Sequence, residues 1–423
     1  MDMRSAASAP WFRIEVDTPG DTGQYASVAY DPALRAIYIS YYDATNQALR
    51  IARDDRATSN CGPGEEWYCH TLDASGADVG RYSSIAVRPA GGGMGIAYHD
   101  ATNGHLKYLW FDNPHLWVYH VATIDKGIPD ISTTGLYTSL RYSADDTPYI
   151  AYYFDNPGGV DALMLTTAKL DAGNCGYDDR ANDWQCDTIH SGEGVGQYAS
   201  LALDRQGRPH ITYYDAGNGD LWYATSVTGS NCGPGGSWTC YPITGSSADV
   251  GRYASLYVDG SDRYHIAYYD ATAKALMYAA RVDTGGNCGV FESAQCDRID
   301  AMGADYHPLG ISIAEDANGY PVIAYQSEYG SLRVARPVAA LGLPAGGGNC
   351  GPEMPLATWY CATIDRYGDW PFYRNGDFVS LTLSPSGLAT IAYSGFITSE
   401  AGGNLAIARQ RYQTVLPLVT RNP

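Results

Sequence analysis

Short runs of apolar and aromatic residues, separated by turn residues, recur along the whole chain. The run HITYYD places two tyrosines and an aspartate after a β-branched residue, and close copies of it are YISYYD, GIAYHD and HIAYYD, at 38–43, 95–100 and 265–270. Val, Ile, Thr and Tyr suit the pleated surface of a sheet, whereas Gly, Asp and Asn mark turns. The pattern predicts β-strands throughout.

The runs fall into a repeat unit of roughly 55 residues, which is a period typical of solenoids and propellers. The unit reads G-x-Y-x-S-L-x-V-D, H-I-x-Y-Y-D, L-x-Y-A and W-x-C-x-x-I-D, so it holds four expected strands. Its first run has seven copies, beginning at residues 23, 80, 135, 196, 251, 304 and 376. Four strands repeated seven times predict an all-β fold, a seven-bladed β-propeller of four-stranded antiparallel blades.

The two ends of the chain predict how the ring closes. WFRIEVD at 11–17 matches the last run of a unit, and LAIARQR at 405–411 matches the third run. We therefore expect the N-terminal strand to complete the last blade as its outermost strand, which removes an open sheet edge. The expected organisation is an N-terminal tail over 1–10, a propeller over 11–411 and a C-terminal tail over 412–423.

The ten cysteines form five close pairs, and each pair brackets the connection between the third and fourth runs of a unit. No C-x-x-C spacing occurs, so zinc is not expected, and disulfides across outer hairpins are predicted. Such bridges indicate an oxidising compartment. The predicted pairs are Cys61 with Cys69, Cys175 with Cys186, Cys232 with Cys240, Cys288 with Cys296, and Cys350 with Cys361.

Composition narrows the function classes. The chain carries a formal net charge of −19, which argues against nucleic acid, because phosphate binding needs clustered Lys and Arg. No apolar run of 18 residues is present, so no transmembrane segment is expected. The first residues, MDMRSAASAPWF, lack the hydrophobic stretch of a signal peptide. Together with the cysteines, this favours an extracellular or cell-surface protein whose export signal has been removed.

The repeated motifs define one candidate binding face. In a propeller the loops that carry G-x-Y and the Asp of Y-Y-D lie at the same end of the blades, so both motifs would line one face. A ring of one aromatic residue per unit is expected there: Tyr25, Tyr82, Tyr137, Tyr198, Tyr253, Tyr306 and Phe378. The aspartates serve as turn residues that accept backbone hydrogen bonds, pair with Arg81 or Arg252, or bind a ligand. The aspartates considered are Asp43, Asp100, Asp215 and Asp270.

The last two units depart from the repeat, and departures from a consistent scaffold tend to mark function. The sixth holds YHP where the others have Tyr and Ser, which places His307 beside Asp305 and Tyr306. The loop into the seventh is expanded to DRYGDWPFYRNGDF and offers further aromatic, basic and acidic side chains. Rings stack on sugar faces and charged groups bind hydroxyls, although the loop could instead plug the channel. The residues singled out there are Trp370, Tyr373, Arg374 and Asp377.

Repeats such as GQYASLALDRQGRPHITYYDAGNGDLWYA resemble those of seven-bladed β-propellers in exported bacterial proteins. The resemblance covers residues 11 to 411 and implies architecture rather than an activity. The first hypothesis is a lectin-like protein that binds a glycan through the motif face without catalysis. The alternatives are a polysaccharide lyase or glycosidase on that face, with His307, Tyr373 and Arg374 as lyase residues, and a structural subunit that binds a surface protein.

No cofactor is predicted. Aspartates spaced one per unit could bind Ca²⁺, but the chain has no D-x-[DN]-x-[DN]-G loop to support it. No metal ligand set is therefore assigned.

Overall fold

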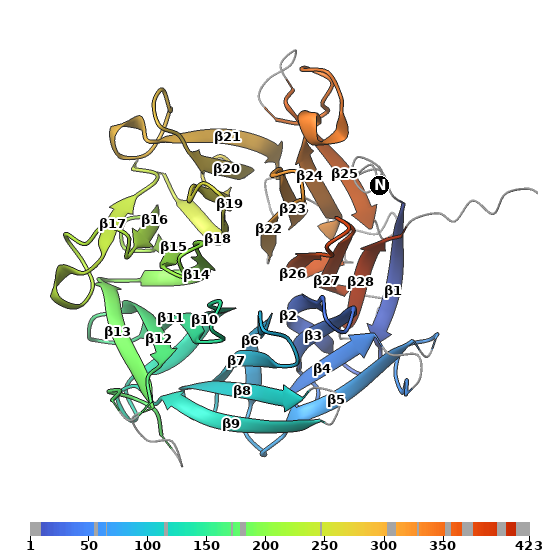
Figure 1. Ribbon diagram of the computed structural model, residues 1–423, viewed down its shortest axis with the longest axis vertical. Coiled ribbons are helices and arrows are strands. Elements are labelled where there is room, and N and C mark those ends of the chain that lie inside the picture. Colours follow the sequence, from blue (N-terminus) through green and yellow to red (C-terminus); the bar gives the residue numbers. More distant parts are fainter. Residues whose placement is uncertain are drawn as a thin grey trace, which may run out of the picture.

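Each repeat unit folds into one four-stranded antiparallel sheet, and seven such sheets stand around a central axis (Figure 1). The protein is therefore a seven-bladed β-propeller, as the sequence predicted. The computed structural model describes residues 10–54, 58–64, 66–113, 117–170, 172–177, 183–245, 248–302, 310–327, 330–351, 357–365, 375–395 and 403–411.

In the first six blades the strands follow chain order from the axis outward. Blade 1 holds β2 (Thr22–Asp31), β3 (Ala36–Asp43), β4 (Ala48–Asp54) and β5 (Trp67–Asp73). Blade 2 holds β6 (Val79–Val87), β7 (Met94–Asp100), β8 (His105–Asn113) and β9 (Val118–Asp125). Blade 3 holds β10 (Thr133–Tyr142), β11 (Pro148–Asp155), β12 (Ala162–Ala168) and β13 (Trp184–Ser191).

The second half of the ring repeats this order. Blade 4 holds β14 (Val195–Leu203), β15 (Pro209–Asp215), β16 (Asp220–Thr225) and β17 (Thr239–Pro242). Blade 5 holds β18 (Val250–Val258), β19 (Tyr264–Asp270), β20 (Ala275–Arg281) and β21 (Ala294–Ala301). Blade 6 holds β22 (Ile311–Glu315), β23 (Pro321–Gln326), β24 (Leu332–Pro337) and β25 (Trp359–Asp365). Short 3₁₀ turns occur at η2 (Pro234–Gly236), η3 (Val290–Glu292) and η5 (Val338–Leu341).

Blade 7 closes the ring with both ends of the chain. Its order from the axis is β26 (Asn375–Leu383), β27 (Ala389–Gly395), β28 (Asn404–Gln410) and β1 (Trp11–Asp17). β1 pairs antiparallel with β28, with Trp11 opposite Gln410 and Ile14 opposite Ile407. In Figure 1 the blue β1 lies beside the red β28. The predicted closure is confirmed, whereas the assignment of the two tails as separate segments stays a prediction.

The core lies between blades, because each sheet is buried on both faces. One cluster of buried side chains joins blades 3 and 4 and includes Leu165, Leu201, Ile211 and Trp238. The tyrosine at the first aromatic position of the Y-Y-D motif is kept and fully buried in every blade, with at most 1% of its surface exposed. The residues are Tyr41, Tyr98, Tyr152, Tyr213, Tyr268, Tyr325 and Tyr393.

The serine of G-x-Y-x-S links the innermost strands into a ring. Each Ser Oγ accepts a hydrogen bond from a backbone N–H of the innermost strand of the next blade, at 3.0–3.1 Å. The ring closes where the N–H of Val28 in blade 1 donates to Ser380 in blade 7. The serines are Ser27, Ser84, Ser139, Ser200, Ser255, Ser312 and Ser380.

All five predicted disulfides are present, each tying a third-to-fourth-strand connection to the outermost strand. The Asn before the first Cys of a pair bonds both backbone groups of the second Cys. Asn231, for example, donates to the carbonyl of Cys240 at 2.8 Å and accepts from its N–H at 2.8 Å. The Gly after the first Cys reaches the preceding blade, as Gly233 N–H does with the carbonyl of Ile189 at 2.8 Å.

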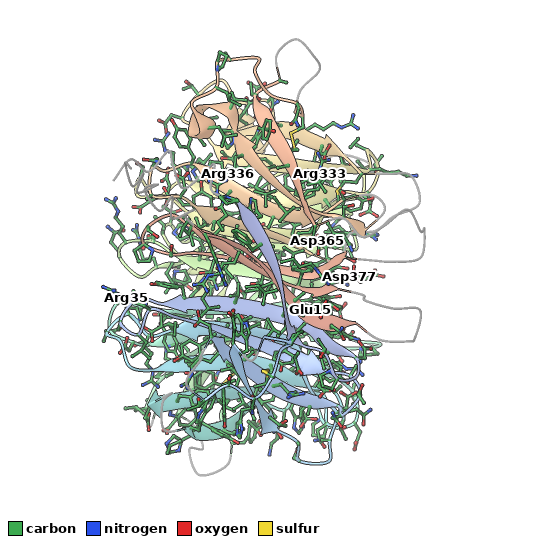
Figure 2. The ribbon with its side chains drawn as sticks, turned by 90° about the vertical axis from the view of Figure 1, so that its right-hand side faces the viewer. Glu15, Arg35, Arg333, Arg336, Asp365 and Asp377 are labelled. Atoms are coloured by element: carbon green, nitrogen blue, oxygen red, sulfur yellow. A yellow bond between two sulfur atoms is a disulfide. The ribbon has the colours of Figure 1, made fainter. Side chains whose placement is uncertain are left out.

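The two ends of the blades form two different faces. We call the end with the G-x-Y segments and the second-to-third-strand turns the motif face, and the other end the opposite face. In the side view of Figure 2, Asp377 lies toward the motif face and Arg35 at the opposite face. Over the described ranges, no helix has the length and apolar character needed to cross a bilayer.

Candidate functional site

The G-x-Y segments share a backbone geometry that turns an aromatic ring into the central channel. Two register shifts in the first strand of every blade except blade 6, for instance on either side of Gln24 in β2, insert extra residues relative to the second strand. The glycine takes a positive φ, and a Cβ at Gly80 would lie 2.7 Å from the Cα of Leu49 in the preceding blade. The aromatic residue that follows also has positive φ, between 51° and 56°, at Tyr25, Tyr82, Tyr137, Tyr198, Tyr253 and Phe378.

These six side chains form an arc of touching rings. Neighbouring ring centroids lie 4.4–4.8 Å apart, and their planes are inclined by 47–57°. One seventh of a full turn is about 51°, so each inclination is the rotation from one blade to the next. The rings are half-buried and line a cavity of about 210 Å³ on the axis. We call this group the aromatic arc.

Among the described residues the arc is open at blade 6, and Tyr306, which the sequence placed in the ring, lies outside them. The cavity lining contributed by blade 6 is Gly310 and Ile311, where other blades contribute the aromatic residue and its successor. Ser312 takes the ring serine position, because its Oγ accepts from the N–H of Leu381 at 3.0 Å. A Cβ at Gly310 would lie 2.3 Å from the backbone N of Val379, so residue 310 itself has no room for a side chain.

Burial sets the protonation of the arc. Burial, with the neighbouring hydroxyl of Tyr82, raises the pKa of Tyr25. Burial raises the pKa of Tyr137, Tyr198 and Tyr253 in the same way. The hydroxyls are therefore neutral near pH 7, where each can donate and accept hydrogen bonds. The arc offers apolar ring edges and neutral hydroxyls, and no charge of its own.

A polar group of Arg, Asp and Tyr side chains lies beside the arc on the motif face at two blade boundaries. Arg81 donates to both carboxylate oxygens of Asp78, at 2.5 and 3.3 Å, and Tyr42 donates to the same carboxylate at 2.7 Å. The Arg81 guanidinium lies 5.3 Å from the centre of the Tyr42 ring. Burial, together with the hydrogen bond to Asp78, raises the pKa of Tyr42 to about 12.

The same polar group recurs at the boundary between blades 4 and 5, where it consists of Arg252, Asp249 and Tyr214. The guanidinium of Arg252 donates to Asp249 at 2.5 and 3.1 Å, and Tyr214 donates to Asp249 at 2.7 Å. Arg81 and Arg252 thus pair with an aspartate three residues before them. They do not pair with the aspartates of Y-Y-D, which corrects the partner that the sequence suggested.

The Y-Y-D aspartates hold the turns that follow them. Asp43, Asp100 and Asp215 are buried, and each accepts from the backbone N–H and the side-chain amide of an Asn three residues later, at 2.8–3.2 Å. Asp270 accepts from the N–H of Ala273 at 2.6 Å. The turn function is confirmed by these bonds. A binding role stays a prediction, because a ligand would have to compete with them.

The two tyrosines of the motif serve two different neighbouring blades. Tyr41 donates to Asp17 of the preceding blade at 2.6 Å, whereas Tyr42 donates to Asp78, in the segment that leads into the following blade. The aspartate of W-x-C-x-x-I-D is the partner of the first tyrosine at five of the seven boundaries: Asp17, Asp73, Asp125, Asp300 and Asp365. Sequence analysis missed this role, although both residues recur in the unit.

The opposite face carries a second kind of buried constellation that sequence analysis missed. His210 lies between Asp204, at 3.4 Å, and the Tyr223 hydroxyl. His265 lies in the same way between Asp259, at 3.3 Å, and the Tyr278 hydroxyl, at 2.5 Å. Burial lowers the pKa of both imidazoles. The signal was a His before I-x-Y-Y-D together with Tyr in L-x-Y-A, and it occurs in blades 4 and 5.

The other candidates divide between described and undescribed positions. Asp377 is buried in blade 7 and accepts a hydrogen bond from Gln326. Asp305, Tyr306, His307, Trp370, Tyr373 and Arg374 lie outside the described residues. Within the described ranges, no group of three or more His, Cys, Asp or Glu side chains is arranged to hold a metal ion.

No protein-family model matches the chain, and no curated protein sequence matches it. Solved structures with a similar course of the chain include a Hadza microbial sialidase, Hz136, with 12% identity and a TM-score of 0.46, covering 81% of this chain and 66% of that one. A mutant of AofleA from Arthrobotrys oligospora has 11% identity and a TM-score of 0.47, covering 77% and 86%. The polysaccharide lyase Uly1 has 10% identity and a TM-score of 0.47, covering 93% and 90%. At such identities these likenesses concern architecture, and what those proteins do is not transferred to this chain.

Proposed function

We propose that this propeller is an exported carbohydrate-binding protein that holds a glycan on its motif face, against the aromatic arc. The observation that supports this most is the arc itself: six aromatic side chains, each in an unfavourable left-handed backbone conformation, around an open cavity of about 210 Å³. Such a conformation costs on the order of 1 kcal/mol per residue and is kept where function needs it. Blade packing alone does not require it six times.

The chemistry of the motif face suits a polyhydroxylated ligand. Aromatic rings provide apolar surface for the C–H faces of a sugar, and neutral tyrosine hydroxyls donate or accept. Around them, Arg81 and Arg252 are already neutralised by Asp78 and Asp249. A net charge of −19 disfavours a polyanion such as nucleic acid. A neutral glycan is the partner that fits these charges.

The other candidate residues of blades 6 and 7 belong, on this proposal, beside the gap in the arc. Residues 303–309 run directly into Gly310, at the gap, and residues 366–374 run directly into β26, which carries Phe378. Asp305, Tyr306, His307, Trp370, Tyr373, Arg374 and Asp377 would complete the binding surface there. Five disulfides support the companion proposal that the protein works outside the cell or on its surface.

A glycan array on the purified protein tests the proposal, with each spot analysed afterwards for degraded glycan. Binding without product is expected. The variant Tyr198→Asn should lose roughly tenfold or more in affinity for the strongest glycan, the equivalent of about 1.4 kcal/mol. Asn is chosen because it tolerates the left-handed backbone while it removes the ring.

The matched control is Arg35→Asn, an exposed residue at φ 53° on the opposite face, which should bind as the unmodified protein does. Equal losses in both variants, or no glycan bound, would contradict the proposal. New unsaturated sugar ends that absorb ultraviolet light would instead favour the lyase alternative. His307→Ala, which should then abolish product but leave binding, would test the residue assigned to that chemistry.

A further inference from the structure

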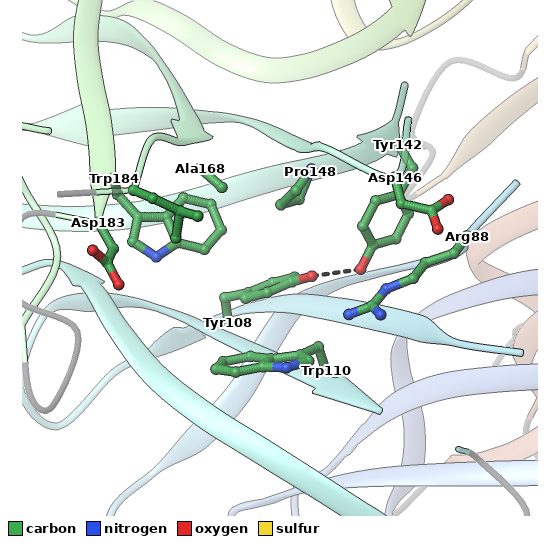
Figure 3. Close-up of a pocket in the computed structure, with 10 residues that line it drawn as sticks. Arg88, Tyr108, Trp110, Tyr142, Asp146, Pro148, Ala168, Asp183 and Trp184 are labelled. Carbon is green, nitrogen blue, oxygen red and sulfur yellow. Dashed lines mark hydrogen bonds between the residues drawn. The ribbon is translucent and has the colours of Figure 1, made fainter. Parts of the chain in front are cut away.

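We propose a second ligand site, on the opposite face, in which the pocket between blades 2 and 3 holds one pyranose ring of a neutral sugar (Figure 3). The pocket is lined by Arg88, Tyr108, Tyr142, Asp146 and Trp184, among others. This site is separate from the aromatic arc and goes beyond the function proposed for the motif face.

Blades 4 and 5 have a different set of side chains at the equivalent place. In blades 4 and 5 the third-strand tyrosine is held by a chain of Asp, His and Tyr: Asp204 with His210 and Tyr223, and Asp259 with His265 and Tyr278. The cavity of about 450 Å³ beside His210 and Tyr223 is lined mainly by polar side chains such as Arg208, Asp262 and Arg281. The imidazole occupies the space beside the tyrosine hydroxyl. A repeat of this kind in two adjacent blades indicates a packing device of the scaffold.

Blade 2 keeps the tyrosine of this device and replaces its other two members. Gly95 takes the position of His210, since Gly95 pairs with Trp110 across the sheet as His210 pairs with Thr225. Arg88 takes the position of Asp204, because both donate their backbone N–H across the turn that follows the first strand. A glycine and a cation therefore stand where blades 4 and 5 have an imidazole and a carboxylate.

The pocket at blade 2 differs in having aromatic walls. Tyr108 stacks on Trp110 with ring centres 5.5 Å apart, and meets Trp184 edge-on at 5.2 Å. Its hydroxyl is hydrogen-bonded to that of Tyr142, from blade 3. Figure 3 shows Trp184 at one end of the pocket and Tyr142 with Arg88 at the other. The volume of about 130 Å³ is close to the roughly 150 Å³ that holds one benzene molecule, so the occupant is a single six-membered ring.

The polar groups at the rim decide which ring fits. The guanidinium of Arg88 lies 4.0 Å from Asp112 and is hydrogen-bonded with Tyr108 and Tyr142, while its Nε makes no hydrogen bond within the described residues. With five N–H donors, this guanidinium can also donate to a ligand oxygen at the rim. Asp146 lies at the same end of the pocket as Arg88, and Asp183 lies at the other end beside Trp184, so two carboxylates and one cation line the pocket (Figure 3). This balance disfavours an acidic sugar and suits hydroxyl groups, which both donate and accept.

The test is a ligand-observed NMR titration of the purified protein with D-glucose, D-galactose and D-mannose, and with D-glucuronic acid and phenol as comparison probes. At least one neutral hexose should bind saturably, and glucuronic acid should bind more weakly. Arg88→Asp and Trp110→Thr should each weaken hexose binding roughly tenfold or more. Both substitutions introduce the residue found at the equivalent position of blade 4, Asp204 or Thr225, so the fold has a precedent for them.

Two controls keep the outcome interpretable. Trp222→Met removes a tryptophan from blade 4, where blade 5 has Met277, and should leave hexose binding unchanged. Tyr198→Asn on the motif face should also leave it unchanged, which separates this site from the function proposed above. Binding of phenol without hexose, stronger binding of glucuronic acid, or hexose binding that both pocket variants leave at the level of the unmodified protein would overturn the proposal.

Discussion

At the scale of single residues, the chain places side chains by accepting backbone conformations that L-residues disfavour. Positive φ at Tyr25, Tyr82 and the other three tyrosines of the aromatic arc is paired with a glycine two residues earlier, which passes against the preceding blade. The cost, on the order of 1 kcal/mol per residue, is offset by ring contacts at 4.4–4.8 Å and by the serine bonds that follow. The G-x-Y-x-S motif therefore determines the local backbone conformation as well as the side chains.

His99 shows how one substitution in the repeat changes pH dependence. It replaces the second tyrosine of blade 2, is 3% exposed, and its Nδ1 bonds the carbonyl of Thr134 at 2.7 Å. Burial lowers its pKa, with Arg81 acting in the same sense, while the Thr134 carbonyl, Asp100 and Asp78 oppose the shift. The unfolded chain therefore takes up a proton as pH falls below about 6.5, while folded His99 does not.

The prediction is that stability falls as pH drops below about 6.5, and falls less in His99→Gln, which introduces the residue that blade 6 has at this position. The measurement is the free energy of unfolding in urea at pH 7.5, 6.5 and 5.5. The variant should reduce the slope without removing it, because burial also lowers the pKa of His210 and His265. An unchanged slope would show that His99 does not carry this dependence.

At the scale of elements, the N-C-G segment holds the outermost strand in place in each blade that has a disulfide. Asn231 satisfies both backbone groups of Cys240, the disulfide joins Cys232 to Cys240, and Gly233 reaches Ile189 in the preceding blade. Three adjacent residues thus hold the outermost strand, β17, and the blade boundary together. Because the outermost strand is an edge, these bonds also cover groups that could pair with another chain.

Asn231→Ala should therefore destabilise the protein by about 1–3 kcal/mol, because it leaves two backbone groups of Cys240 without their partner. Urea unfolding under oxidising conditions measures the change. Ser230→Ala is the matched control, since the side chain of Ser230 is exposed, and it should change stability by less than about 0.5 kcal/mol. Similar effects of the two variants would mean that the disulfide alone holds the strand.

At the scale of the whole molecule, the ring is held by contacts that cross every blade boundary. The first tyrosine of Y-Y-D donates to an aspartate of the preceding blade, and at three boundaries a cation from the third strand joins it: Arg50, Lys107 and Arg333. Where the aspartate is replaced by His190 or Thr244, the position of the cation holds Trp222 or Met277. The boundary between blades 2 and 3 is an intermediate case, because Asp125 accepts from Tyr152 while the position of the cation holds Met164.

The close contact between Lys107 and Asp73 predicts a strong coupling at the boundary between blades 1 and 2. Lys107 contacts Asp73 at 2.6 Å, and their side chains are 14% and 8% exposed. Lys107→Met should cost about 3 kcal/mol, because it leaves the Asp73 carboxylate buried without its cation. The double variant Lys107→Met with Asp73→Thr, which copies Met277 and Thr244, should cost less than the single one. Calorimetric or urea unfolding of the unmodified protein, the single variant and the double variant measures the coupling. A double variant that is less stable than the single one would refute it.

The sequence predicted the blades, the closing strand and the disulfide pairs, because each depends on local spacing and repetition. It misplaced the ring position of blade 6, because the segment ADYHP was aligned by its tyrosine. Counting back from the first tyrosine would have corrected this: Ser255 lies thirteen residues before Tyr268, and Ser312 lies thirteen residues before Tyr325. The pocket of blade 2 could not be predicted, because it depends on Tyr142 and Trp184 arriving from another blade.

The most direct test of the central claim, that a glycan binds against the aromatic arc, is amide hydrogen exchange with and without the strongest glycan of the array. Slower exchange is expected in the G-x-Y segments around the channel, with the largest effect flanking Gly310. Exchange in the turns of the opposite face, such as the turn that contains Arg35, should stay unchanged when this glycan saturates the motif face. Protection confined to the opposite face, or spread evenly over both, would contradict the account.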